Sequence, residues 1–154
     1  MKNKKPEIDS LIECTNPDII IGTETWLDPS ISSAEYFNSN TYTVYRKDRP
    51  PNQKGQSHGG VLIAIKNDYQ SIECKELQTN CENVWVELTL FNSRKLIIGS
   101  FYRPRPDDNT SLGHLNESFA VSTKILSQFY LLVVTSTLEI LTGIRLAPFL
   151  ENQT

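Results

Sequence analysis

The chain has 154 residues, of which 38% are hydrophobic and 21% are charged, so it has room for one globular domain with a buried core. Its 15 lysines and arginines against 18 acidic residues give a net charge of −3, which excludes a generally basic surface for nucleic acid but not a local basic rim. The three cysteines are an odd number at irregular spacing, which is typical of reduced thiols and of neither a disulfide framework nor a zinc site. We therefore expect an intracellular protein of the cytoplasm or nucleus.

Neither end of the chain predicts a targeting or membrane segment. No apolar stretch follows the lysines of residues 1–6, so we expect no signal peptide. The apolar region 125–150 is interrupted by polar residues, including Glu139 and Arg145, so we expect no membrane span.

The first predicted elements are a short helix and a buried strand. Pro6 opens the helix, apolar residues follow at helical spacing, and Asn16-Pro17 ends it. Residues 19–21 are three isoleucines, which predict a strand buried on both faces of a covered sheet. Glu24 follows at the carboxyl end of this strand, where open α/β sheets place their ligands. A solvated acid is the simpler interpretation of Glu24 taken alone.

A basic loop separates the next two predicted strands. Residues 42–47 alternate like a half-exposed strand, and residues 59–66 predict a central strand that begins with two glycines, a sign of close backbone approach or a bulge. The intervening segment 48–58 has the composition of a loop. With Arg46, Lys47, Arg49 and Lys54 against Asp48, it is the most basic surface that the sequence predicts. A solvated loop is at least as good an interpretation as a phosphate-binding one.

A hairpin and a second helix complete the predicted domain. We expect an edge strand over 69–77 and a β-hairpin over 82–102, with Val84, Val86, Leu88 and Leu90 on one face. The hairpin ends in Tyr102-Arg103-Pro104, and a helix is predicted over 111–129. This order is not a repeated βαβ unit, so a simple doubly wound sheet is disfavoured.

Two stretches carry a resemblance to a known family. The segment 18–27, Asp-Ile-Ile-Ile-Gly-Thr-Glu-Thr-Trp-Leu, and the segment 101–104, Phe-Tyr-Arg-Pro, resemble motifs of the endonuclease/exonuclease/phosphatase superfamily. The residues of the two segments are most similar to those of the endonuclease domain of non-LTR (LINE-type) retrotransposons. The resemblance covers roughly residues 4–130 and implies an α/β (α+β) fold, the first half of a DNase-I-like four-layer sandwich of two mixed sheets.

The resemblance also implies roles for individual residues. Glu24 would be a ligand of a catalytic Mg²⁺ or Mn²⁺, and Tyr102 would be catalytic, its phenol donating a hydrogen bond to a phosphate oxygen. Arg103, Arg49 and Arg46 would bind substrate phosphates. The implied partners are DNA and, in a full-length relative, a reverse transcriptase domain. A Tyr-Pro packing pair at a strand end is the alternative interpretation of residues 102–104.

The sequence also departs from the family pattern. Arg105 stands where a second proline is usual, and no first strand with its metal-site Asn precedes the helix, so we expect the domain to begin one strand late. The family's Gly-Asp-Phe-Asn and Ser-Asp-His motifs do not occur. His58 and His114 are interpreted as surface histidines.

The C-terminal segment has an unusual explanation. A set of codons can be chosen that encodes Gly-Gly-Asp-Phe-Asn-Leu-Gly-Asp-Ile-Asp-Trp. When the same codons are read one base late, they encode residues 133–143 of this chain. We therefore predict a domain over 1–130 and a divergent, frameshifted tail over 131–154. Residues 133–137 have the propensity to imitate the lost strand, with threonines where Asp and Asn belong, and residues 138–154 are expected to complete no sheet.

Three hypotheses for function follow from the sequence. The first is a divalent-metal-dependent phosphodiesterase that nicks DNA, inactive in this chain because its motifs are incomplete. The second is a non-catalytic remnant that binds nucleic acid or a partner through the basic 46–58 loop. The third is a phosphatase or sphingomyelinase relative, which the residues of the two motifs favour less than the retrotransposon endonucleases.

Overall fold

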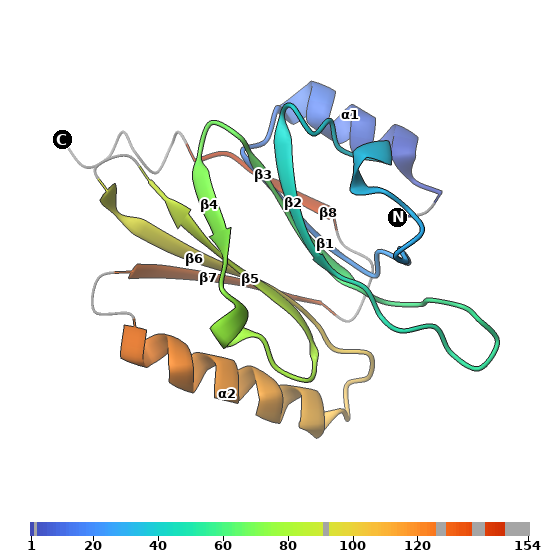
Figure 1. Ribbon diagram of the computed structural model, residues 1–154, viewed down its shortest axis with the longest axis vertical. Helices are drawn as coiled ribbons and strands as arrows, with labels where there is room; N and C mark the ends of the chain where they lie inside the picture. The colour runs from blue at the N-terminus through green and yellow to red at the C-terminus, as the bar shows by residue number, and fades with distance from the viewer. Residues whose placement is uncertain (2, 91–92, 126–128, 137–140, 147–154) are drawn as a thin grey trace.

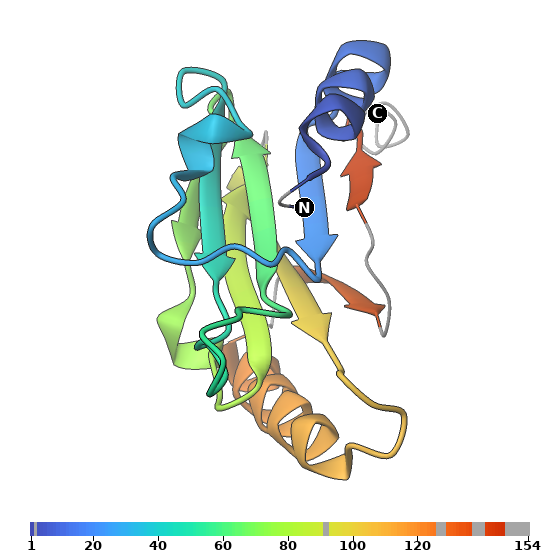
Figure 2. The ribbon, with the colours of Figure 1, turned by 90° about the vertical axis from the view of Figure 1, so that its right-hand side faces the viewer.

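Two four-stranded sheets face each other in the computed structural model, and one helix covers the outer side of each (Figures 1 and 2). The structure describes residues 1, 3–90, 93–125, 129–136 and 141–146, and of residues 123–125, 129–136, 141 and 142 the backbone alone. The four layers are those of the predicted α/β sandwich. In the described residues, no helix has the length and apolar character needed to cross a bilayer.

The first sheet has the strand order β2-β3-β1-β8, and each of its described pairs is antiparallel. Its strands are β1 (Ile19–Thr23), β2 (Tyr42–Lys47), β3 (Val61–Lys66) and β8 (Leu141–Ile144). Every residue of β1 and β3 is buried, as the unbroken apolar runs predict for central strands. The helix α1 (Lys5–Thr15) lies outside this sheet and ends at Asn16, whose left-handed φ of 42° closes it before Pro17.

The second sheet has the order β4-β5-β6-β7, and here the mixed character appears, because β6 and β7 are parallel. Its strands are β4 (Gln70–Glu73), β5 (Glu82–Thr89), β6 (Lys95–Tyr102) and β7 (Phe129–Ser136). The helix α2 (Asn109–Ile125) connects β6 to β7 and covers the outer face (Figure 1). Short 3-10 helices, η1 (Ser33–Glu35) and η2 (Lys75–Leu77), lie in the connections.

Three apolar cores correspond to the three interfaces between layers. The central core lies between the sheets and includes Ile19 and Ile21 of β1 with Val84, Val86 and Leu88 of β5, the face predicted from the alternation. The core under α1 contains Ile20, whose side chain lies on the opposite face of β1, together with residues of α1, β3 and the 27–42 segment. The third core joins β5, β6 and η2 to α2.

The third core depends on a glycine that makes room for a tryptophan. Gly99 of β6 is the register partner of Trp85 on β5, and a Cβ atom at Gly99 would lie 2.4 Å from Cζ3 of the fully buried Trp85 ring. The ring contacts Phe119 of α2 edge to face, with centroids 6.1 Å apart. The indole thus fills the space between sheet and helix that a side chain at 99 would occupy.

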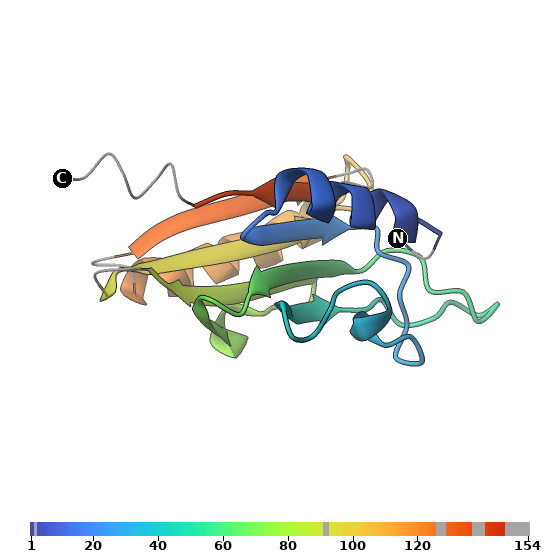
Figure 3. The same ribbon diagram turned by 90° about the horizontal axis from the view of Figure 1, so that it is seen from above.

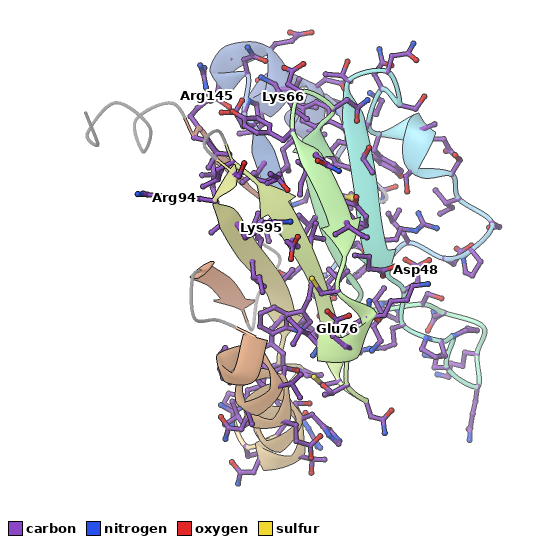
Figure 4. All side chains as sticks on the ribbon, turned by 60° about the vertical axis from the view of Figure 1, so that its left-hand side comes forward. Asp48, Lys66, Glu76, Arg94, Lys95 and Arg145 are labelled. Carbon is purple, nitrogen blue, oxygen red and sulfur yellow. The ribbon has the colours of Figure 1, made fainter. Side chains whose placement is uncertain are left out.

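A buried carboxylate anchors the last described strand to the first sheet. Asp18 accepts a hydrogen bond from the backbone N–H of Leu146 at 2.8 Å and forms ion pairs with Lys66 at 3.4 Å and Arg145 at 3.8 Å. Lys66 and Arg145 lie near the top of Figure 4, whereas Asp48, which follows β2, lies lower, at the opposite end of the first sheet.

Three sequence-based expectations need correction. The helix predicted over 111–129 is α2 (Asn109–Ile125), and Phe129 begins β7, because the apolar run from 129 pairs with β6. The predicted edge strand 69–77 divides into β4 and η2. Residues 133–136 do form a strand beside β6, but the expectation that residues 138–154 complete no sheet is wrong for 141–144, since β8 pairs with β1. Residues 138–140 and 147–154 lie outside the described residues.

Gly99→Ala should destabilise the protein by about 1–3 kcal/mol, because the new methyl group overpacks against the Trp85 ring. Urea denaturation followed by far-UV circular dichroism measures this. Gly113→Ala, at an exposed position of α2 where nothing lies within 4 Å of the new Cβ, is the matched control. It should stabilise the protein by up to about 1 kcal/mol. Equal effects of the two substitutions would contradict the packing argument.

Candidate functional site

The turn that carries Glu24 leaves β1 in a strained conformation. Glu24 and Trp26 have φ angles of 54° and 55°, in the left-handed region that non-glycine residues occupy at a cost of about 1–3 kcal/mol each. Two backbone hydrogen bonds hold the turn: Thr25 N–H donates to Gly60 O at 3.2 Å, and Trp26 N–H donates to Gly59 O at 2.8 Å. The strain is therefore balanced by the segment that precedes β3.

Gly59 and Gly60 let this segment approach closely. Their φ angles are 108° and 87°, and a Cβ at Gly60 would lie 2.7 Å from the hydroxyl oxygen of Thr25. A Cβ at Gly59 would lie 2.6 Å from the guanidinium carbon of Arg49. The prediction that these glycines mark a close backbone approach is confirmed.

An ion pair connects the two sheets at this end. The carboxylate of Glu82, the first residue of β5, pairs with the guanidinium of Arg49 and accepts the Gly60 N–H at 2.6 Å. Arg49 in turn lies over the ring of Tyr102, with its Cζ atom 5.6 Å from the ring centroid, within the range of a cation–π contact. Tyr102 is itself the register partner of Glu82 across β5 and β6.

Glu24 and Tyr102 consequently lie at the same end of the sandwich. The hydroxyl of Ser100 on β6 donates to Gly22 O of β1 at 3.3 Å. Glu24 follows Gly22 by two residues, just past the end of β1, and Tyr102 follows Ser100 by two residues, at the end of β6. The Gly60–Glu82–Tyr102 contacts lead to the same placement from the other side. The described open pocket, of about 510 Å³, lies elsewhere, between α1 and the 34–42 segment.

The other two predicted phosphate-binding arginines are engaged within the protein. Arg103 donates to the carbonyl groups of Asp108, at 3.2 Å, and Pro106, so it closes its own loop. Arg46 forms an ion pair with Asp48 at 3.1 Å and donates to Asp28 O at 3.0 Å. Their roles toward a substrate stay predictions, as do those of Glu24, Tyr102 and Arg49.

Charged groups at the end of β2 are partly desolvated. Lys47 donates to the carbonyl groups of Thr79 and Cys81 at 2.7 and 2.8 Å, and burial lowers the pKa of its ammonium group. Burial raises the pKa of Asp48, against the opposing effect of its partner Arg46. These contacts fix the base of the 48–58 loop and engage the charges of Lys47 and Asp48 within the protein.

The described residues do not fit a preformed divalent-metal site. They contain no group of three or more His, Cys, Asp or Glu side chains that could hold a metal ion. An oxygen of Glu24 accepts the Trp26 indole N–H, and Glu82 is engaged by Arg49 and Gly60. Mg²⁺ needs six oxygen ligands in near-octahedral geometry, and Glu24 supplies at most a small part of them.

The motifs did not indicate two residues of this end, Glu82 and His58. Glu82 carries no motif, and its role depends on contacts with residues distant in the chain. The ring of His58, interpreted as a surface histidine, is half-buried and stands edge-on to the Trp26 ring, with centroids 4.6 Å apart. Only the pair of glycines after His58 could have indicated that this segment approaches the Glu24 turn.

Glu82→Gln should destabilise the protein by about 1.5–3 kcal/mol, because it removes a charged acceptor from Arg49 and Gly60 at a largely buried position. Chemical denaturation measures the change. Asp9→Asn is the matched control: its ion pair with Lys5 is exposed and should contribute no more than about 0.5 kcal/mol. Equal losses in the two variants would show that the Glu82 contacts do not join the sheets energetically.

The comparisons with known proteins identify the fold. No protein-family model and no curated protein matches the chain. The chain is similar to the solved structure of the endonuclease domain of TRAS1, a telomere-specific non-LTR retrotransposon, with a TM-score of 0.52 and 16% sequence identity. The match covers 85% of this chain and 52% of the other, so this chain spans about half the length of that structure. The chain therefore shares the fold of that domain, the DNase-I-like α/β sandwich that the sequence predicts.

Proposed function

We propose that this chain is a DNase-I-like domain that binds DNA at the Glu24–Tyr102 end without cleaving it. The observation that carries the proposal is the register of β7, which runs parallel to β6 and places Thr135 and Ser136 opposite Phe101 and Tyr102. This is the strand end at which the family resemblance implies an Asp and an Asn. Neither residue type occurs there.

Hydrolysis of a phosphodiester demands more groups than this end supplies. A water must be deprotonated and oriented, and the developing negative charge on the phosphate must be stabilised, commonly by a divalent cation. Glu24 and Tyr102 offer one carboxylate and one phenol, while Glu82 is neutralised by Arg49. The geometry therefore supports binding of a phosphodiester better than its cleavage.

The basic loop supports DNA as the ligand. Arg49, at the base of this loop, is paired with Glu82, whereas from Pro50 to His58 the chain contains Lys54 and no acid, and this loop projects beyond the end of the sheets (Figure 3). Contacts of such cations with phosphates dominate the affinity of proteins for DNA. By the same resemblance, a longer relative would carry a reverse transcriptase domain.

Metal-dependent nicking is the second candidate, because Glu24 and Tyr102 do share one end of the fold. A Mg²⁺ or Mn²⁺ ion would then polarise the phosphate at Glu24. The two candidates make opposite predictions for plasmid DNA.

Incubation with supercoiled plasmid and Mg²⁺ should give retarded but un-nicked DNA on a gel. Binding to duplex DNA, followed by fluorescence anisotropy, should weaken with salt. Lys54→Gln should reduce the slope of log K against log salt concentration by about 1, whereas Arg94→Gln, at the opposite end of β6, should not. Mg²⁺-dependent nicking that disappears in Glu24→Ala would establish the second candidate instead.

Isothermal titration calorimetry should detect no tight, stoichiometric binding of Mg²⁺ in the absence of nucleic acid, because Glu24 provides too few oxygen ligands. Glu24→Gln should leave the titration unchanged. A stoichiometric heat signal that vanishes in Glu24→Gln would contradict the conclusion that the site is not preformed.

A further inference from the structure

One large aromatic side chain at the Glu24–Tyr102 end is left in solvent. Trp26 is 46% exposed, whereas the protein's other tryptophan, Trp85, is fully buried. The residues on either side of Trp26, Thr25 and Leu27, are both buried, so the chain itself does not leave the protein surface at this point. The three apolar cores are formed without the Trp26 ring. The side chain is therefore held outward by the turn itself.

The Trp26 ring is also fixed in place. Its indole N–H donates to a carboxylate oxygen of Glu24, and its backbone N–H donates to Gly59 O at 2.8 Å. The ring stands at 81° to that of His58. The left-handed φ of 55° is unfavourable for a bulky residue and persists only because these contacts determine it. A ligand that contacts this ring would not have to immobilise it first.

The surroundings of the ring indicate the chemistry of the ligand. Gly59, which holds the Trp26 backbone, is in contact range of the Arg49–Glu82 ion pair, and the segment from Pro50 to His58 adds Lys54 and no acid. An exposed aromatic ring next to a loop of net positive charge matches a ligand with a flat aromatic part attached to phosphates. Single-stranded nucleic acid has this chemistry, and proteins bind it by stacking bases on aromatic rings beside a basic track. In a duplex the faces of the bases are stacked on one another and are not accessible.

We propose that Trp26, supported by His58, is a stacking platform for an unpaired nucleobase of single-stranded nucleic acid. This inference rests on the proposed binding of nucleic acid at the same end and adds a preference for unpaired bases. Glu24 acts in it as a positioning residue, because its carboxylate holds the indole N–H.

The test compares an oligothymidylate with an abasic oligonucleotide of the same length and charge, which offers the phosphates without the bases. Trp26 fluorescence reports contact directly, since the other indole, Trp85, is shielded from solvent. We expect the oligothymidylate to quench the fluorescence and to bind more tightly than the abasic strand. An oligouridylate arm distinguishes RNA from DNA as the source of the base.

Variants separate stacking from general attraction. Trp26→Ala should weaken binding of the oligothymidylate roughly 5- to 150-fold and leave binding of the abasic strand unchanged, while Trp26→Tyr should restore most of the affinity. Ile72→Ala removes another exposed apolar side chain, 63% exposed on β4, and should change neither. Circular dichroism confirms that each variant is folded, and the wild-type comparison of the two strands does not depend on any variant.

Equal binding of the two strands by the wild-type protein, or an unchanged preference in Trp26→Ala, would overturn the stacking platform and leave the proposed function standing. Binding of neither strand and of no duplex would reject both. The inference is supported if the wild-type protein prefers the oligothymidylate and if Trp26→Ala loses this preference while Ile72→Ala keeps it.

Discussion

The absence of side chains at Gly59 and Gly60 is the constraint on which this end of the molecule depends. Their positive φ angles turn the chain so that two carbonyl groups face the Glu24 turn and one N–H faces Glu82. Any Cβ at these positions would collide with Thr25 or Arg49. One dipeptide therefore connects the end of β1, the base of the basic loop and the first residue of β5, and through Glu82 it connects the first sheet to the second.

Much of the fold follows from the sequence because the strands have strong, local signals. The isoleucines of β1 and the apolar run of β3 predict the observed central strands. The alternation of β5 predicts that strand and its face toward the central core, but not the burial of Asn83 and Trp85 on its other face. The limits of α2 and β4 were predicted less well, because Asp108 caps the helix earlier than the apolar spacing indicates and because η2 turns the chain after Glu73. Helix ends depend on such local caps more than on periodicity.

The location of the candidate site was predicted in part. The family resemblance pointed to Glu24 and Tyr102, and the structure brings them to one end. The resemblance could not reveal that the Trp26 indole donates a hydrogen bond to the Glu24 carboxylate or that Arg49 is paired with Glu82. Nor could it reveal that Arg103 donates to a carbonyl group of its own loop. The Arg49–Glu82 contact depends on the packing of the two sheets, whereas the Glu24–Trp26 and Arg103–Pro106 contacts are local and depend on turn conformations that the motifs do not specify.

The four-residue strand β8 and the Asp18 anchor have a consequence for self-association. β1 is an interior strand of its sheet on the side of β8 only because β8 supplies its hydrogen-bond partners there. If β8 detached, the backbone groups of an entirely buried, isoleucine-rich strand would become an open edge, and such an edge is a template for pairing with another chain. The ion pairs and hydrogen bond at Asp18 therefore protect the protein against aggregation as well as against unfolding, and the two properties are controlled at the same carboxylate.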